Sequence, residues 1–268
     1  MQPIHQNTVQ MRYMGSKARL AKHILQFIQE ALLDKPNSVY VEPFMGGCNI
    51  LSQVDHPLKI GMDNNSYLVR LWQSLRDGEF IPPMKLTEEE YYDMKDDFLR
   101  NGGKYSKPML AYAMFCCSYG SKPWGGYARL NERRGEDHIK EAWRNITRQV
   151  MNFRNLHETI FEECDYRDTE GIVGVDFGSD HEKGMVIYCD PPYKATQGYM
   201  SEFDHTAFWK WVKDMTLKGN TVLVSEYEAP NDFTCIWSKV KKDGLALYAD
   251  GDRQSDKVER LFVYDRAI

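Results

Sequence analysis

The residues best suited to chemistry form the motif Asp190-Pro191-Pro192-Tyr193, which follows an apolar run at 185–189. An apolar run with β-branched residues predicts a buried strand of a parallel sheet, and open α/β sheets bind ligands where such strands end. The two prolines remove backbone N–H donors and keep the chain extended, so that carbonyl oxygens can face a ligand. A fixed carboxylate, a fixed carbonyl and an aromatic ring suit a planar base that carries an amine. A strand followed by a proline-rich turn is the simpler alternative.

A second candidate site lies at residues 38–51, where the pattern predicts a strand, an acidic turn, two glycines and a helix. Gly46 and Gly47 would let a ligand approach the backbone, and the amides after them would be unpaired. The turn is not G-x-G-x-x-G, so it does not indicate a dinucleotide pyrophosphate. Asp63 ends the next short strand about twenty residues after Glu42, where an acid meets ribose hydroxyls in a doubly wound fold.

Two further segments can contribute to the same site. Residues 12–17 precede a helical apolar pattern, which Ser16 can cap. Lys17 and the free amides of the helix start would attract a carboxylate or phosphate, although a capped surface helix with a solvated lysine is the alternative. Asp165 ends another predicted short strand and could accept a hydrogen bond from an adenine amine.

The overall composition is that of an ordinary soluble protein. The 268 residues are 42% hydrophobic and 27% charged, and the net charge is −5. No apolar run is long enough to span a membrane, and the polar N-terminus lacks the apolar core of a signal peptide. None of the six cysteines has the C-x-x-C spacing of a zinc or redox site. This cysteine usage predicts reduced thiols in an intracellular protein that holds no metal.

The middle of the chain departs from this acidic average. Residues 100–154 contain eleven Lys and Arg but only four Asp and Glu, a net charge of +7, which leaves −12 for the remainder. Aromatic residues and glycines lie among these basic residues, a combination typical of nucleic-acid recognition. A basic surface loop with two ordinary helices is the alternative. The candidate nucleic-acid-binding residues are Tyr119, Lys122, Trp124, Tyr127, Arg129, Arg133 and Arg134.

Strands that alternate with helical stretches predict a three-layer α/β fold with a mostly parallel sheet. Residues 245–248 and 259–264 are expected to pair as a closing hairpin. A proline pair at 82–83 breaks the helical pattern, so we place a domain boundary there. The expected units are a catalytic domain at 1–80 and 155–268, and an insert at 81–154.

These motifs, in this order, resemble the DNA adenine-N6 methyltransferases of the Dam (D12) class, in its phage-modification branch. The resemblance covers most of the chain, and its motifs are those at 12–17, 42–47, 61–65, 165–166 and 190–193. It implies a Rossmann-like, S-adenosylmethionine-dependent methyltransferase fold with an inserted, mostly helical target-recognition region. The implied cofactor-binding residues are Tyr13, Met14, Gly15, Lys17, Glu42, Pro43, Phe44, Gly46, Gly47, Asp63, Asn64, Asp165, Tyr166 and Asp190, and the implied catalytic residues are Asp190, Pro191, Pro192 and Tyr193.

The resemblance also implies partners and a location. The expected partner is double-stranded DNA, in the cytoplasm of a bacterial host or a phage-infected cell, and the protein is expected to be a monomer or weak dimer. Residues 225–230 resemble the phage branch more than the cellular Dam enzymes. The hairpin motif of members that read GATC is absent after Tyr119, so the sequence predicts no particular recognition site.

The resemblance and the residues together predict a mechanism. Asp190 and the Pro191 carbonyl would accept the two N–H bonds of adenine's amine, whose nitrogen attacks the sulfonium methyl without a covalent enzyme intermediate. The base would leave the duplex and stack on Tyr193, while Lys17 and Tyr13 hold the methionine end of the cofactor. A buried ion pair at Asp190, or a crevice too narrow for a base, would contradict this mechanism.

Several other functions are compatible with parts of the sequence. A cytosine-N4 methyltransferase needs the same grip on an exocyclic amine, and a catalytically silent DNA-binding relative would keep the basic insert. Cytosine carbon-five chemistry is disfavoured because the chain has no Pro-Cys dipeptide. Protein glutamine methylation uses Asn where Asp190 stands and leaves the basic insert unexplained. A Rossmann-type oxidoreductase is disfavoured because the three-glycine fingerprint is missing.

Overall fold

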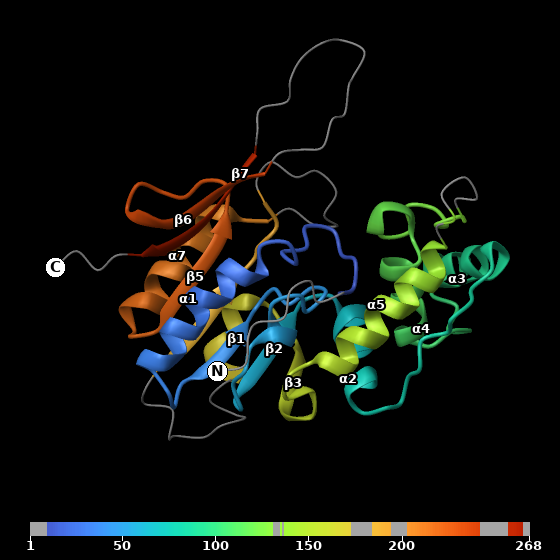
Figure 1. The fold of residues 1–268 in the computed structure, drawn as a ribbon, viewed down its shortest axis with the longest axis horizontal. Helices are drawn as coiled ribbons and strands as arrows, with labels where there is room; N and C mark the ends of the chain where they lie inside the picture. Colours follow the sequence, from blue (N-terminus) through green and yellow to red (C-terminus); the bar gives the residue numbers. More distant parts are fainter. Residues whose placement is uncertain are drawn as a thin grey trace, which may run out of the picture.

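The computed structural model describes residues 10–130, 135, 137–172, 184–193, 203–241 and 257–264. At its centre is one seven-stranded sheet with the strand order β3-β2-β1-β4-β5-β7-β6 (Figure 1). The strands are β1 (Val39–Glu42), β2 (Lys59–Asp63), β3 (Thr159–Glu163), β4 (Met185–Cys189), β5 (Thr221–Glu226), β6 (Phe233–Lys241) and β7 (Lys257–Tyr264). The first five in this order run parallel, and β7 is antiparallel to both β5 and β6. This is the mostly parallel sheet that the sequence predicts.

The strand order places a ligand crevice between β1 and β4. From β1 the sheet extends one way through β2 and β3, and the other way through β4 and β5, so the direction of winding reverses between them. Loops that leave the carboxyl ends of two such strands diverge and leave a crevice for a ligand. Every residue of β1 and β4 is buried, which explains why both strands, apart from Glu42 at the end of β1, are apolar on both faces.

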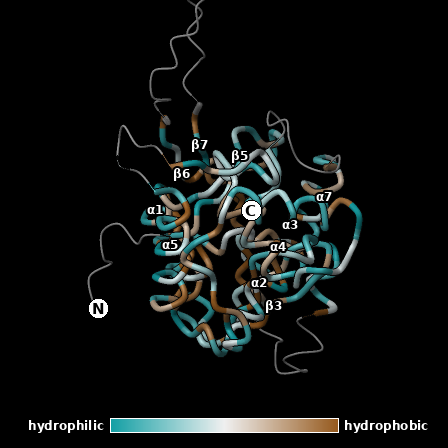
Figure 2. Tube along the Cα trace, turned by 90° about the vertical axis from the view of Figure 1, so that its right-hand side faces the viewer, coloured by the Kyte–Doolittle hydropathy of each residue, from teal (hydrophilic) through white to brown (hydrophobic). Residues whose placement is uncertain are grey.

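Helices cover both faces of the sheet. Tyr40 and Tyr188 face one core, which also contains the apolar sides of α1 (Ala21–Asp34) and α2 (Ser66–Arg76). The alternate residues Val41 and Ile187 face a second core, which they share with α7 (His205–Leu217). Figure 2 shows many of the apolar stretches toward the middle of the molecule and hydrophilic stretches along much of its outer edge. The predicted three-layer α/β architecture is therefore confirmed.

The insert between α2 and β3 is mostly helical. It contains α3 (Glu88–Arg100), α4 (Lys107–Ala111), a π-helical turn η2 (Tyr112–Cys116), a short 3₁₀ turn η3 (Tyr119–Ser121) and α5 (His138–Asn152). Figure 1 shows these helices at the end of the molecule away from β6 and β7. A capping box of Thr87 and Glu90 begins α3, because each of these side chains accepts a hydrogen bond from the other residue's backbone N–H.

The insert is packed onto the rest of the molecule and is not a separate globule. Tyr91 of α3 and Ile146 of α5 belong to the same core as Trp72 of α2. The buried Lys59 of β2 donates hydrogen bonds to the carbonyl oxygens of Val54 and Arg154, which ties the end of the insert to the sheet. One hydrophobic core spans both parts, and the domain boundaries at 81 and 154 stay a prediction.

Two local predictions differ from the structure. Helix α1 begins at Ala21 with Leu20 as its N-cap, so Ser16 does not cap it; the Ser16 hydroxyl instead accepts from the backbone N–H of Ala18. Strand β7 pairs with β6 along its length, so β6 takes the place expected for residues 245–248, which lie outside the described residues. Among the helices that the structure describes, none combines the length and apolar composition needed to cross a bilayer.

Candidate active site

A cavity of about 490 Å³ opens at the carboxyl ends of β1, β2 and β4. Its volume lies in the range of small-molecule sites. Every residue that the sequence assigned to the cofactor or to catalysis lines it, although these residues come from five separate segments. The sequence did not assign the other lining residues, among which Arg167, Tyr227 and Glu259 carry polar groups.

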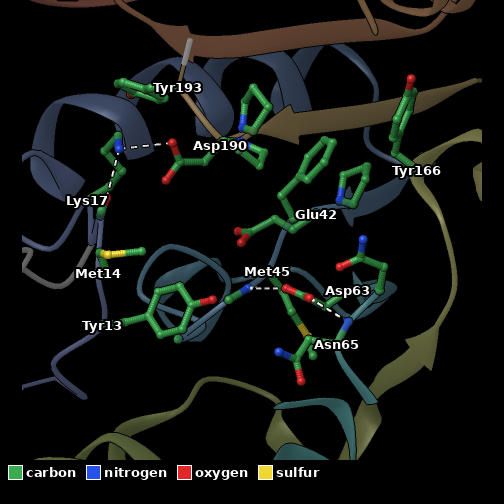
Figure 3. A pocket seen from close by; sticks show the side chains of 18 of the residues that line it. Tyr13, Met14, Lys17, Glu42, Met45, Asp63, Asn65, Tyr166, Asp190 and Tyr193 are labelled. Atoms are coloured by element: carbon green, nitrogen blue, oxygen red, sulfur yellow. Dashed lines mark hydrogen bonds and ion pairs between the residues drawn. The ribbon is translucent and has the colours of Figure 1, made fainter. Parts of the chain in front are cut away.

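The cavity has two sides, which Figure 3 shows opposite one another. The glycine-turn side, around the turn after β1, consists of Glu42, Gly46, Asp63 and Asn65. The proline-turn side, around the turn after β4, consists of Lys17, Asp190, Tyr193 and Glu259.

Backbone hydrogen bonds organise the glycine-turn side. The Asp63 carboxylate accepts from the N–H of Gly46 at 3.0 Å and from the N–H of Asn65 at 2.9 Å. Asn65 is in turn the N-cap of α2, because its side chain accepts from the N–H groups of Tyr67 and Leu68. One carboxylate therefore fixes both the glycine turn and the start of the next helix.

The two glycines are needed for a contact that the sequence did not suggest. Gly46 has a φ of +45°, and a Cβ added there would lie 2.8 Å from the Tyr13 ring. A Cβ on Gly47 would lie 2.9 Å from the Tyr13 Cβ. Glycine is therefore required because Tyr13 packs directly on the turn, and not only because a ligand must approach the backbone.

Two acids on the glycine-turn side ionise less readily than usual. Burial raises the pKa of Asp63 to about 6, although its two backbone hydrogen bonds oppose this rise. Burial also raises the pKa of Glu42 to about 8, despite a hydrogen bond of 2.6 Å from the Tyr40 hydroxyl. Acids held in this way are stabilised by a cation placed beside them, so this side of the cavity favours a positively charged ligand.

An ion pair dominates the proline-turn side. Lys17 Nζ lies 2.9 Å from Asp190 Oδ1, donates to the Gly15 carbonyl at 2.9 Å and lies 4.4 Å from the centre of the Tyr193 ring. The sequence assigned Lys17 to the methionine end of a cofactor, whereas the structure places it on the predicted catalytic acid. Burial raises the pKa of Asp190, and the neighbouring Lys17 opposes that rise.

The mechanism predicted from the sequence sets a condition: Asp190 must not be buried in an ion pair. The Lys17–Asp190 pair tests this condition. The Lys17 side chain is 5% exposed, whereas that of Asp190 remains 22% exposed and lines the cavity. Lys17 engages Oδ1, and Figure 3 shows the other carboxylate oxygen pointing into the cavity. The acid therefore has a counter-ion and still presents an oxygen to a ligand.

Tyr193 is held by Glu259 of β7 and by Tyr227, which follows β5. Its hydroxyl donates to Glu259 Oε2 at 2.9 Å, and its ring packs edge-to-face on Tyr227 with the ring centres 4.6 Å apart. Tyr193 and Glu259 are both buried. Neither Glu259 nor Tyr227 was assigned to the site from the sequence. For Glu259 there was a signal, an acid inside an apolar strand pattern.

At the far wall, the acid predicted to bind an adenine amine already has a partner. The Asp165 carboxylate accepts from the backbone N–H of Arg167 and forms an ion pair with its guanidinium at 2.6 Å. Beside it, the ring of Tyr166 packs against Phe44 and Phe208. This wall therefore offers apolar rings and a paired acid.

The predicted nucleic-acid-binding residues divide into two groups. Trp124 and Tyr127 pack on Tyr91 inside the insert, and the Tyr127 hydroxyl donates to the Leu86 carbonyl, so these rings support the insert. Tyr119 and Lys122 are exposed. Arg129 is exposed and forms an ion pair with Glu88, whereas Arg133 and Arg134 lie outside the described residues.

A second hollow of about 870 Å³ adjoins the cavity. The two share Tyr13, Ser16 and Glu259 among their lining residues. The cationic side chains that line this hollow are those of Arg12, Arg19 and Lys239, and the exposed ring of Tyr119 lies among them.

The comparison with known proteins agrees with the family resemblance of the sequence. Residues 13–226 match the family model of D12 class N6 adenine-specific DNA methyltransferases. This chain belongs to that family. The match runs from Tyr13, which packs on the glycine turn, to the end of β5, and so includes Asp63 and Asp190.

Individual relatives are more distant. The chain is 22% identical over 225 residues to the type II methyltransferase M.FokI of Planomicrobium okeanokoites, a match that covers 78% of this chain and 32% of the relative. The chain thus spans about a third of that relative's length. Two solved structures of the rRNA methyltransferase aviRa from Streptomyces viridochromogenes align over 97% of this chain and 90% of theirs, with TM-scores of 0.42 and 0.40 and identities of 13% and 14%.

Proposed function

We propose that the protein transfers a methyl group from S-adenosylmethionine to the N6 amine of adenine in double-stranded DNA. The observation that carries the proposal is a single cavity that joins Asp63, at the end of β2, to Asp190, at the end of β4. Membership of the D12 family supports the choice of adenine and of DNA. The finer assignments, to a phage-modification branch and to the cytoplasm, rest on the resemblance alone.

The glycine-turn side fits the methyl donor. When bound, S-adenosylmethionine supplies an activated methyl group on a sulfonium, a cation that suits the two acids of raised pKa, Glu42 and Asp63. Asp63 retains lone pairs beyond its two backbone hydrogen bonds, and these can accept from ribose hydroxyls. The rings of Phe44 and Tyr166 offer an apolar wall for an adenine ring.

The proline-turn side fits the target amine. The exposed oxygen of Asp190 and the Pro191 carbonyl would accept the two N–H bonds of the amine, which orients its nitrogen toward the methyl group. Lys17 keeps the Asp190 side chain in one position, and Tyr193 provides a ring beside it. Acceleration then comes from positioning and electrostatics, without a covalent bond to the enzyme.

We further propose that DNA binds over the second hollow. Its cationic residues, Arg12, Arg19 and Lys239, would contact phosphates, and the hollow leads into the cavity that an extruded base must enter. The insert at 81–154 would supply target recognition, with Tyr119 and Lys122 as its exposed contacts. Because Trp124 and Tyr127 pack inside the insert, their role would be to support this surface.

The test is methyl transfer from labelled S-adenosylmethionine to unmethylated DNA, followed by digestion to nucleosides and mass spectrometry. The proposal predicts N6-methyldeoxyadenosine with the wild-type protein and none with Asp190→Ala. Label found in N4-methyldeoxycytidine would show that the target is cytosine and not adenine. A retarded DNA band without any transfer would indicate a catalytically silent DNA-binding relative.

A further inference from the structure

Glu259 is a buried acid next to the predicted catalytic residues, and neither the sequence motifs nor the proposed mechanism uses it. It lies on β7, where 4% of the residue is exposed, and it lines both the cavity and the second hollow. Its Oε2 accepts the hydrogen bond of the Tyr193 hydroxyl at 2.9 Å. A carboxylate is costly to bury, so one kept at this place calls for an explanation.

The surroundings of Asp190 show what Glu259 can do. Titratable groups from several elements lie around Asp190, and some favour its ionisation whereas others oppose it. The positive Lys17, on the segment before α1, favours the charged form of Asp190, whereas the negative Glu259, from β7, disfavours it. The other titratable groups that line this part of the cavity are Glu42 from β1, Tyr188 from β4, Tyr193 after β4 and Tyr227 after β5.

The backbone places Glu259 there for a structural reason. Its neighbours in the β7 sequence pair with the central strand β5, where Arg260 is opposite Glu226 and Leu261 is opposite Ser225. This antiparallel pairing brings the start of β7 alongside the end of β5, next to the turn that follows β4. Tyr193 therefore has this partner only when β7 is paired with β5.

We propose that Glu259 is a positioning residue that holds the Tyr193 hydroxyl and, through its negative charge, keeps Asp190 a strong hydrogen-bond acceptor toward the target amine. This inference rests on the proposed function and deepens it. Without the opposing charge of Glu259, the Lys17 cation would act more strongly on Asp190 and would weaken it as a hydrogen-bond acceptor.

The same charge would assist the proton step of the reaction. As the amine nitrogen forms its bond to the methyl carbon, the carbon–sulfur bond breaks and the sulfur keeps the electron pair. The nitrogen then carries one proton too many, and Asp190 accepts it before releasing it to water. A carboxylate next to Asp190 favours this acceptance, because it raises the affinity of Asp190 for a proton.

The test compares the pH dependence of single-turnover methyl transfer in the wild type, Glu259→Gln, Tyr193→Phe and Glu259→Asp. The Gln side chain keeps the size and an acceptor oxygen but removes the charge. In the pH–rate profile of Glu259→Gln, we expect the acid limb, where the rate falls as pH decreases, to move to lower pH. We also expect the plateau rate to fall about tenfold. Tyr193→Phe keeps the charge of Glu259, so its rate should fall without that downward shift.

Two further variants complete the comparison. Glu259→Asp retains the charge and should return the acid limb toward that of the wild type. Glu163→Gln removes an exposed acid at the end of β3, outside the cavity, and should leave both the limb and the rate unchanged. An acid limb in Glu259→Gln that coincides with that of the wild type would overturn the proposal.

A readout without catalysis separates this inference from the proposed function. Carboxyl-¹³C NMR of protein labelled at aspartate reports the titration of Asp190 directly, and Asp190→Asn assigns the resonance. The titration should move to lower pH in Glu259→Gln and remain in place in Glu163→Gln. If the wild type transfers no methyl group but this shift is present, the proposed function fails and the coupling stands; if the shift is missing, the coupling fails.

Discussion

The two sides of the cavity are built in different ways. On the glycine-turn side, a carboxylate binds backbone N–H groups: Asp63 holds Gly46 and Asn65. On the proline-turn side, side chains bind side chains from distant segments: Lys17 pairs with Asp190, and Tyr193 with Glu259. The first arrangement is local, because its partners are at most 17 residues apart in the sequence. The second depends on the whole chain being folded, and its charges are coupled.

This difference suggests a division of labour. A backbone-organised site can exist before the ligand arrives and suits a cofactor that is bound in every cycle. A coupled group of charges suits the chemical step, because its members can adjust the proton affinity of one acid. If the division is real, substitutions on the two sides should affect different measurements.

The largest effect is expected from Asp190→Ala. Removing the acceptor should lower the rate of methyl transfer by about a thousandfold or more. The target amine would no longer be oriented, and the positive charge that develops on its nitrogen would no longer be stabilised. The affinity for S-adenosylmethionine, measured by calorimetry, should change little, since the glycine-turn side is untouched. Full activity in this variant would end the mechanism.

Asp63→Ala should show the opposite pattern. The N–H groups of Gly46 and Asn65 would lose the carboxylate that accepts their hydrogen bonds, and the ribose hydroxyls would lose the same acceptor. We expect the dissociation constant for S-adenosylmethionine to rise about 10- to 100-fold. Transfer at saturating cofactor should be affected much less. Asp96→Asn, on the exposed face of α3, is the matched control and should bind normally.

Lys17→Met tests how the ion pair on the proline-turn side affects the ionisation of Asp190. The Lys17 cation lowers the pKa of Asp190, so its loss should raise that pKa and move the acid limb of transfer to higher pH. At neutral pH the rate should fall about tenfold and should recover in alkaline buffer. Lys22→Met, on the exposed face of α1, should leave the profile unchanged. A limb that moves to lower pH would contradict the assigned role of the pair.

Glu42→Gln should give the smallest effect, on stability. Burial raises the pKa of Glu42 to about 8 from 4.5, so the folded state binds its proton more tightly than the unfolded state does. Stability of the ligand-free protein should therefore fall as pH rises from 4.5 to 8, and the Gln variant should lack this loss. Relative to the wild type, its Tm should be unchanged near pH 4.5 and higher near pH 8, by about 2–4 °C for each kcal/mol that ionisation of the buried acid costs the wild type. An equal difference in Tm at both pH values would contradict the burial of an ionisable acid.

The same contrast explains what the sequence could predict. Asp63 and the glycine turn lie on neighbouring parallel strands, where spacing along the chain determines which ends meet, so their convergence could be predicted. The partner of Tyr193 could not, because Glu259 is 66 residues away and reaches it through the antiparallel strand β7. Lys17 illustrates the same limit: its type suggested an anionic ligand, and the anion turned out to be another side chain of the protein.

The insert shows a second limit. Charge counting found the basic segment, but it treated Trp124 and Tyr127 as equivalent to Tyr119. The first two rings pack on Tyr91 and the third is 71% exposed, a distinction that depends on packing within the insert. Aromatic residues supply both core contacts and base contacts, so their type alone does not separate the two roles.

The most direct test is a crystal structure with S-adenosylhomocysteine bound. We expect the ribose hydroxyls at Asp63, the adenine ring beside Phe44 and Tyr166, and the sulfur directed toward Asp190 with room between them for an amine. A ligand that lies in the reverse orientation, with its ribose at Asp190, or that binds outside the cavity, would contradict this expectation.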